Sequence, residues 1–371
     1  MRNVENWLPC WCLHSLSLSL SLSLSLSHAQ VIARDRLVGV LDRLVQQQYG
    51  KHVTVHRGVA CTDVSWLEDD SVLLTTQPTR ASDSEVATGM ISRQRPSLLI
   101  AADGAARTVA DCLEASEAKR GKNRGILSLF PFSRRFRVTR YKDDNRRVYK
   151  TIPIKFPKGW RGDLNYSART KDGRINIDAL PASRKNDYCA VLLLRADDVM
   201  AAADTDPAEL RALMDTSLPM FSPLIDDATL RAVAAKKSSS LPAFRYVGPY
   251  LHRGTSTVLI GDAVHTVKPY FGLGANSALE DVIKLSQSLD RHVGGDGAKS
   301  EGVRGAGVAA AIEEYSKQRA PEARALVQIS REFDRPGILG FVTFILPLIL
   351  DGLFNGLIRL FIYFLFSLPT A

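Results

Sequence analysis

The chain has 371 residues, 45% of them hydrophobic and 23% charged, so it can build one large or two medium domains, which excludes global disorder. Its net charge of +9 favours anionic partners such as phosphates, acidic substrates or an anionic membrane surface. Nucleic acid is not expected as a partner, because the charge is spread along the chain and no zinc-finger spacing or aromatic RNA-binding signature is present.

The chain begins with an unusual tract in which serine and leucine alternate over residues 15–27. Serine at every second position leaves no apolar core for a signal peptide. A translated dinucleotide repeat at a faulty gene start explains the tract, so we expect residues 1–30 not to fold.

The next part of the chain has the rhythm of an α/β sheet domain. An amphipathic helix is predicted over 34–48, with Leu37, Leu41, Leu44 and Val45 as its apolar stripe. Short β-rich runs follow, and each is a strand candidate. These runs cover residues 53–55, 59–66, 71–76 and 97–101.

The pattern changes between residues 125 and 194, where short runs separated by turn residues predict antiparallel strands. The runs are 136–139, 147–149, 175–177 and 189–194. We expect a second, sheet-rich domain here, followed by a helix over 207–220 and by a buried strand over 256–260.

The basic residues and the cysteines of the chain bear on two further kinds of site. A basic run is either the solvated face of a strand pair or a docking site for a nicotinamide cofactor's phosphates. It comprises Arg134, Arg135, Arg137, Arg140, Lys142, Arg146 and Arg147. The five cysteines have neither CxxC pairs nor a nearby histidine spacing, so no metal site and no disulfide framework are predicted.

The residues from 256 to 281 carry the strongest pattern, namely a buried strand, a turn, a glycine-containing loop and a helix. Asp262 follows Gly261 at the end of the strand, where a carboxylate can accept hydrogen bonds from sugar or ribityl hydroxyls. Gly272 and Gly274 would let main-chain amides face a ligand. The helix start near Ala275 and Asn276 offers partial positive charge to an anion.

This stretch resembles the second FAD fingerprint of the flavoprotein aromatic hydroxylases. The matching residues are Gly261-Asp262-Ala263, His265, Pro269, Gly272-Leu273-Gly274, Asn276 and Glu280-Asp281. The resemblance implies a site for the flavin's ribityl chain and ring edge. It places His265 in a structural position of the turn and implies no catalytic side chain. Tyr270 and Phe271 would lie beside the flavin ring and line either the substrate pocket or the core.

Two further matches extend the resemblance toward the first half of the chain. Asp103 and Gly104, with Thr108 after them, correspond to the family's Asp-Gly motif at a strand end. Arg107 and Ala110 depart from the family's serine and arginine, which weakens the inferred contact with phosphate or nicotinamide cofactor. Arg34 matches the arginine that begins a helix facing the FAD phosphates, although a plain surface arginine fits as well.

Residues 177–181, which lead to the run 189–193, look like the substrate-domain strand pair of kynurenine 3-monooxygenases. The helix with Tyr315, Arg319, Pro321 and Leu326 looks like the segment that follows the family's flavin fingerprint. The implied activity uses FAD, NAD(P)H and O2 to hydroxylate a small aromatic substrate. Alternatives are another flavin oxidoreductase such as an epoxidase or prenyl reductase, a non-catalytic flavin-fold remnant, and a membrane-anchored interaction protein.

The family's first fingerprint, Gly-x-Gly-x-x-Gly, does not precede Arg34. We therefore predict an α/β (α+β) fold with an incomplete Rossmann-like FAD-binding domain over 31–115 and 245–330 and an inserted antiparallel-sheet substrate domain over 116–244. The segment 331–371 has no charged residue over 336–350 and 360–371, and it predicts C-terminal apolar helices that either pack in the core or lie on a membrane. By resemblance, that membrane would be the mitochondrial outer membrane or another organelle membrane.

Overall fold

The computed structural model describes most of the chain between Arg34 and Asp334. The described residues are 34–79, 91–123, 135–142, 145–170, 173–183, 185–202, 204–269, 272–293 and 301–334, with Leu350 and Phe354. They form a mixed α/β fold with two compact units. The sheet unit contains the described residues up to Val55 together with Arg146–Leu241, and the motif unit contains His56–Asn145 and the described residues from Pro242 onward.

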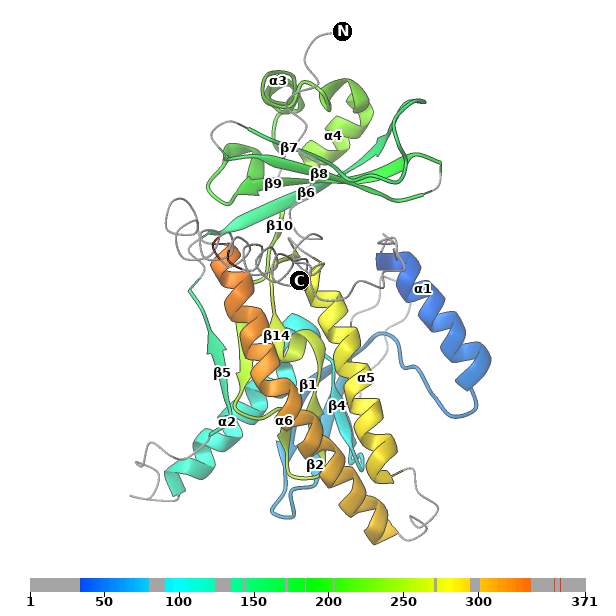
Figure 1. Cartoon of the computed structure of the whole chain (residues 1–371), viewed down its shortest axis with the longest axis vertical. Helices are drawn as coiled ribbons and strands as arrows, with labels where there is room; N and C mark the ends of the chain where they lie inside the picture. The colour runs from blue at the N-terminus through cyan, green and yellow to red at the C-terminus, as the bar shows by residue number, and fades with distance from the viewer. Residues whose placement is uncertain are drawn as a thin grey trace, which may run out of the picture. The chain divides into compact units, whose positions relative to one another are not determined.

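The sheet unit is built on five antiparallel strands in the order β10-β6-β9-β8-β7 (Figure 1). Their bounds are β6 Arg147–Lys155, β7 Tyr166–Arg169, β8 Asn176–Pro181, β9 Asp187–Arg195 and β10 Ser239–Ser240. This confirms the predicted change to antiparallel strands. Side chains at alternate positions point to the same face, and Ile152 and Ile154 on β6 are buried in this way.

Two helices cover the buried face of this sheet, α3 (Pro207–Ser217) and α4 (Asp227–Ala235) (Figure 1). Both begin at an aspartate whose carboxylate accepts an amide of the first turn: Asp206 accepts from Ala208, and Asp226 accepts from Thr229. Leu210, Met214 and Leu230 turn inward and complete the core with the sheet.

The first described helix also belongs to the sheet unit by its contacts. It is α1 (Arg34–Leu44), and it continues as a π-helical turn over Val45–Tyr49. The structure confirms the predicted helix. Its apolar stripe is not buried, however, because Leu41 and Leu44 are exposed and none of the residues of the helix is buried. The predicted strand over 53–55 is also wrong, since these residues have no strand partner.

The motif unit contains three small sheets, each of three strands. The sheet β1-β2-β3 is antiparallel, β14-β11-β5 is antiparallel, and β12-β13-β4 joins one antiparallel pair to one parallel pair. The bounds are β1 Val59–Trp66, β2 Val72–Pro78, β3 Ser92–Gln94, β4 Leu99–Ala101, β5 Arg137–Arg140, β11 Arg245–Gly248, β12 His252–Arg253, β13 Thr257–Leu259 and β14 His265–Thr266.

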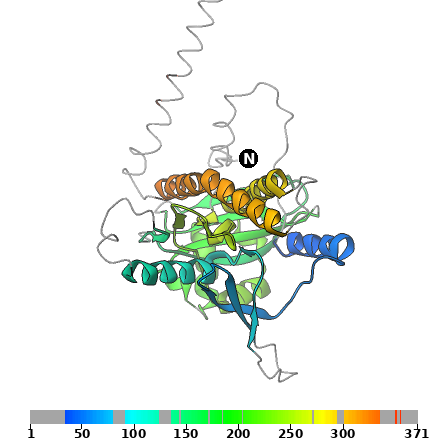
Figure 2. The same ribbon diagram turned by 90° about the horizontal axis from the view of Figure 1, so that it is seen from below.

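Three helices pack around these strands, and their bounds are α2 Thr108–Asn123, α5 Leu273–Val293 and α6 Glu301–Phe333. The helix α6 contacts β11, β12 and β14, whereas α2 contacts β1 and β5, so the two helices lie on opposite sides of the strands (Figure 2). On α5, Leu285 is buried, whereas Val282 is exposed. The buried positions are Asp281, Leu285 and Ser288, so a carboxylate occupies the place of an apolar side chain.

Candidate functional site

A sharp turn follows the buried strand β13 and carries the predicted Gly-Asp pair. Gly261 has a φ of +62°, a left-handed conformation that costs other residues about 1–2 kcal/mol. A Cβ at this position would also lie 3.3 Å from the Cβ of Ala278 on α5. The backbone conformation and the close approach of α5 therefore both require glycine here.

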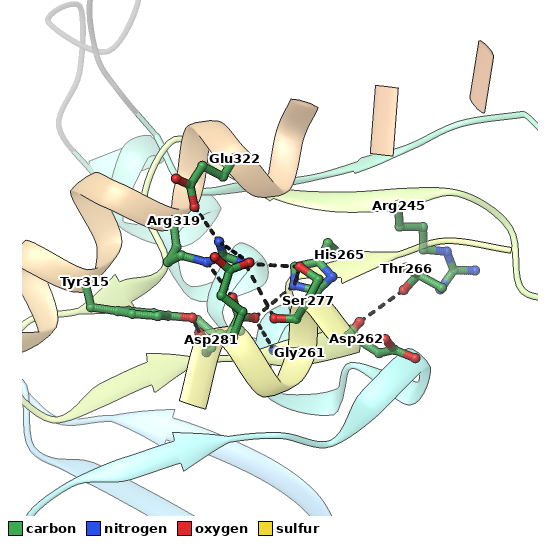
Figure 3. A network of polar contacts seen from close by, with 12 residues as sticks. Arg245, Gly261, Asp262, His265, Thr266, Ser277, Asp281, Tyr315, Arg319 and Glu322 are labelled. Atoms are coloured by element: carbon green, nitrogen blue, oxygen red, sulfur yellow. Dashed lines mark hydrogen bonds and ion pairs between the residues drawn. The ribbon is translucent and has the colours of Figure 1, made fainter. Parts of the chain in front are cut away.

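The buried carboxylate of Asp281 holds this turn from α5 (Figure 3). Its Oδ2 accepts the N–H of Gly261 at 2.7 Å and the Nε2–H of His265 at 2.9 Å. Its Oδ1 accepts the Nε–H of Arg319 at 2.7 Å. Burial alone raises the pKa of Asp281, but these three hydrogen bonds outweigh it and hold the pKa below its ordinary value.

Arg319 brings α6 into the same network (Figure 3). Its side chain is 4% exposed, and its other nitrogens contact Glu280 at 3.1 Å, the hydroxyl of Ser277 at 3.0 Å and the carboxylate of Glu322. Burial lowers the pKa of Arg319, but the contacts with its carboxylate partners, chiefly Asp281, outweigh this and raise it. The buried aspartate and arginine are thus an ion pair whose hydrogen-bonding groups are well satisfied.

Asp262 differs from these neighbours because its side chain is exposed. Its backbone carbonyl accepts the hydroxyl of Thr266 at 3.0 Å, while its carboxylate has no hydrogen bond or ion pair with any described residue. A Cβ built on Gly274, in the first turn of α5, would lie 3.8 Å from Asp262 Oδ1. The carboxylate and the start of α5 therefore border the same space.

The predicted Asp-Gly motif forms a second turn, after β4. Gly104 has a φ of +67°, and Asp103 Oδ2 accepts the amide of Val109 at 3.0 Å, which caps the start of α2. Its other oxygen, Oδ1, is buried without a described hydrogen-bond partner. The short helical turns Gly104–Ala106 and Gly261–Ala263 contact each other, and the parallel pairing of β4 with β13 explains why both lie at the same edge.

Arg107 connects the two turns from a fully buried position. Its Nη2 donates to the hydroxyl of Thr266 at 2.5 Å and to the carbonyl of Arg245 at 3.3 Å. Burial and, next, the positive charge of Arg245 lower its pKa to about 10. The arginine that departs from the family pattern thus links the Asp-Gly turn to the strand that follows the Gly-Asp turn.

The structure brings several of the predicted residues together and leaves others untested. Asp103, Gly104, Gly261 and Asp262 lie on the two adjoining turns, with Gly272, Gly274, Ala275 and Asn276 at the start of α5 and Thr108 at the start of α2. Pro269 is exposed in the loop before α5. Arg34 belongs to the sheet unit and stays a prediction. Tyr270 and Phe271 lie outside the described residues.

The sequence alone did not predict a role for Asp281, Arg319, Ser277 or Thr266. Asp281 and Arg319 are 20 and 38 positions from the groups they bind, Gly261 and Asp281. No local pattern reveals such a pair. The one available indication was a charged residue at a position of α5 where the helical period places the core.

The described part of the chain has neither a metal site nor a membrane-spanning helix. No group of histidine, cysteine, aspartate or glutamate side chains there is arranged to hold a metal ion. Among the helices of that same part, none combines the length and the apolar composition needed to cross a membrane. The predicted C-terminal apolar helices lie almost entirely outside the described residues.

Comparison with known proteins identifies the family. The model of the FAD binding domain family matches residues 44–330. Kynurenine 3-monooxygenase 2 of Aspergillus niger is 31% identical over 180 residues, which cover 48% of this chain and 36% of that protein. Kynurenine 3-monooxygenase of Myxococcus xanthus is 31% identical over 122 residues, which cover 33% of this chain and 26% of that protein. The chain thus spans about a third of the length of these curated relatives.

Solved structures show the same fold. A 2-methyl-3-hydroxypyridine-5-carboxylic acid oxygenase matches with a TM-score of 0.52 and 15% identity, covering 81% of this chain and 69% of that one. Klebsiella pneumoniae HpxO, complexed with FAD and uric acid, matches with a TM-score of 0.50 and 18% identity, covering 80% and 62%. These likenesses concern the fold, whereas the family match over residues 44–330 shows that the chain belongs to the FAD binding domain family.

Proposed function

We propose that the protein is an FAD- and NAD(P)H-dependent monooxygenase that hydroxylates a small aromatic substrate of the kynurenine type. The observation that carries the proposal is the exposed, unpaired carboxylate of Asp262 beside the first turn of α5. The kynurenine 3-monooxygenases among the relatives support the substrate class. An epoxidase or prenyl reductase would use the same two turns, but no observation on this chain favours either.

The residues present fit the ribityl chain and ring edge of a flavin. Asp262 offers oxygens that can accept hydrogen bonds from ribityl hydroxyls. The start of α5, where Gly274 carries no side chain, offers partial positive charge to an anionic edge. Asp103 adds a buried oxygen with no described partner, and such an oxygen is costly unless a ligand or water satisfies it.

Bound flavin would supply the redox chemistry, and the chain's own residues would position it. Asp262 would orient the ribityl chain, and the first turn of α5 would stabilise negative charge at the ring edge. His265 is fully buried and bonded to Asp281, so its task is to hold the turn and not to exchange protons with a substrate.

We also propose that the fold is an incomplete Rossmann-like FAD-binding domain, in which the first βαβ unit is not formed. Two exposed surfaces of the motif unit support it. The strand β4 pairs with β13 on one edge and has no described partner on the other, and Ile100 is 45% exposed. On α5, Leu279, Val282 and Ile283 form an exposed apolar stripe. A parallel strand and a helix would bury both surfaces.

Flavin titration of the 371-residue chain tests the function. We expect weak binding, with FAD and riboflavin bound about equally, because the residues assigned to the cofactor, Asp262 and the first turn of α5, face the flavin half that both molecules share. Asp262→Ala should weaken both by about tenfold, the effect of about 1.4 kcal/mol of lost hydrogen bonding. Asp290→Ala removes the same charge from an exposed position on α5 and should change neither. Equal affinities in Asp262→Ala and the unchanged chain would refute the assignment.

Membrane association, at the mitochondrial outer membrane or elsewhere, is a separate proposal that rests on the nearly uncharged C-terminal sequence. Flotation of the full chain with anionic phospholipid vesicles tests it. The proposal expects the protein to float with the vesicles, and a protein that stays at the bottom of the gradient contradicts it.

A further inference from the structure

We propose that Asp281 is a positioning residue of the flavin site, and that its ion pair with Arg319 determines where the Asp262 carboxylate lies. This inference rests on the proposed function, because Asp262 is the residue assigned to the flavin. Asp281 itself is 1% exposed and lies behind the turn, so it contacts no ligand. It acts through the backbone of Gly261, and its effect should therefore appear in the behaviour of Asp262.

The geometry of the turn supports this assignment. The Gly261 N–H donates to Asp281 Oδ2 at 2.7 Å from a backbone with positive φ, so the carboxylate fixes a conformation that would otherwise be one of several. The next residue is Asp262, and the end of the turn is held as well, because His265 donates to the same oxygen. One buried oxygen atom thus fixes the residue before Asp262 and a residue three positions after it.

Arg319 makes this arrangement possible. A carboxylate buried without a partner would be strongly unfavourable, and Arg319 from α6 neutralises it through Oδ1. All three groups that face Asp281 are donors, namely the Gly261 amide, the His265 imidazole and the Arg319 guanidinium. A carboxylate can accept from all of them.

An asparagine at this position cannot satisfy the same three donors. Its oxygen can face Gly261 and His265, but its NH2 group then meets the Nε–H of Arg319; in the other orientation it meets the amide of the turn. Replacing Arg319 by glutamine as well would provide an oxygen for that NH2 group. The pair Asp281→Asn and Arg319→Gln is therefore a designed rescue.

Glu280 provides a matched control. It precedes Asp281 on α5 and contacts the same arginine at 3.1 Å, but its side chain is 51% exposed and, among the described residues, it has no hydrogen bond to the Gly261 turn. Glu280→Gln removes one negative charge next to Arg319 and leaves the hydrogen bonds of Gly261 and His265 intact. A general effect of charge would appear in this variant, whereas loss of positioning would not.

Hydrogen exchange of the full chain, measured on peptides that cover 257–266, tests the inference without any ligand. Asp281→Asn should lower the protection of this segment by about tenfold or more, while protection of β6 and β9 stays unchanged. The double variant with Arg319→Gln should recover most of the protection, and Glu280→Gln should match the unchanged chain. Unchanged protection in Asp281→Asn, or loss without rescue, would overturn the inference.

Flavin affinity distinguishes positioning of Asp262 from a purely structural role of Asp281, because only positioning would change the effect of Asp262→Ala. In the unchanged chain Asp262→Ala should weaken riboflavin binding about tenfold, but in the Asp281→Asn background it should weaken binding less than about twofold, since Asp262 is already displaced. Equal losses in both backgrounds would contradict positioning. If riboflavin does not bind at all, the proposed function fails. The hydrogen-exchange experiment then tests by itself whether Asp281 fixes the conformation of the Gly261 turn.

Discussion

The hydroxyl of Tyr315 on α6 donates to the backbone carbonyl of Leu259 at the end of β13, at 3.2 Å. Tyr315 is completely buried, and the hydrogen bond reaches the strand two residues before Gly261. The hydroxyl oxygen of Ser316 accepts the N–H of Leu251 at 2.9 Å, so neighbouring residues of α6 hold both β13 and the chain before β12. The helix α6 thus supports the Gly-Asp turn from behind.

Tyr315→Phe should reduce the free energy of unfolding by about 1–2 kcal/mol, because it leaves a buried carbonyl without its donor while keeping the aromatic ring. Urea unfolding followed by circular dichroism measures the change. Tyr49→Phe is a matched control, since Tyr49 is 54% exposed, and it should have no measurable effect. Equal stability of Tyr315→Phe and the unchanged chain would show that the hydrogen bond adds nothing.

Gly261→Ala should be destabilising both because of the positive φ and because of the close contact with α5. The substitution Gly272→Ala distinguishes these two contributions. Gly261 and Gly272 have nearly the same φ, +62° and +65°, but a Cβ meets Ala278 at 3.3 Å in the first case and nothing within 4 Å in the second. Gly272→Ala should therefore cost only the backbone penalty, about 1 kcal/mol, and Gly261→Ala should cost clearly more. Thermal unfolding of both variants checks this, and equal costs would exclude a role for the contact with α5.

Lys268 and Asp334 form a second buried ion pair in the motif unit, with 2.7 Å between Nζ and Oδ2. Lys268→Met should cost about 3–5 kcal/mol, because it removes the ammonium group that pairs with the largely buried carboxylate of Asp334. The double variant Lys268→Met, Asp334→Leu should cost less than the single one. Denaturant titration distinguishes the two, and a double variant that is less stable than Lys268→Met would contradict the prediction.

The sequence predicted those parts of the structure that depend on local order along the chain. The strands β1, β2, β6, β8 and β9 follow from their apolar and β-branched runs, and the turn at Gly261 follows from its place between a buried strand and a helix. These features need only short-range preferences. Even so, the bounds of several strands differ by a few residues, because tertiary packing decides where pairing stops.

The remaining features depend on partners that are distant in sequence. The stripe of α1 has a helical period, but period alone does not supply a surface to cover it, and Leu41 is exposed. The buried carboxylate of Asp281 pairs with Arg319 from another helix, and Arg107 donates a hydrogen bond to Thr266, which is 159 positions away. Such pairs are properties of the folded arrangement, so a single sequence does not show them.

Glu314 provides the clearest pH-dependent prediction. It lies on α6 and accepts hydrogen bonds from three residues at the end of α5: Arg291 at 2.7 Å, His292 at 2.8 Å and Ser288 at 3.0 Å. Hydrogen bonds from Arg291, then His292 and Ser288, lower its pKa from 4.5 to about 2. Because the pKa is lower in the folded state, the unfolded state takes up the proton first as the pH falls.

The stabilisation from Glu314 should therefore be complete above a pH of about 4.5 and disappear as the pH falls toward about 2. In Glu314→Gln the thermal midpoint should be lower than in the unchanged chain at neutral pH, and the difference should shrink across this window. Glu313→Gln is the comparison, because the pKa of Glu313 is lowered mainly by the single exposed Lys317 four residues along the helix, and its effect should be smaller. A difference between Glu314→Gln and the unchanged chain that stays constant from pH 6 to about pH 2 would show that the stabilisation does not depend on the ionisation of this carboxylate.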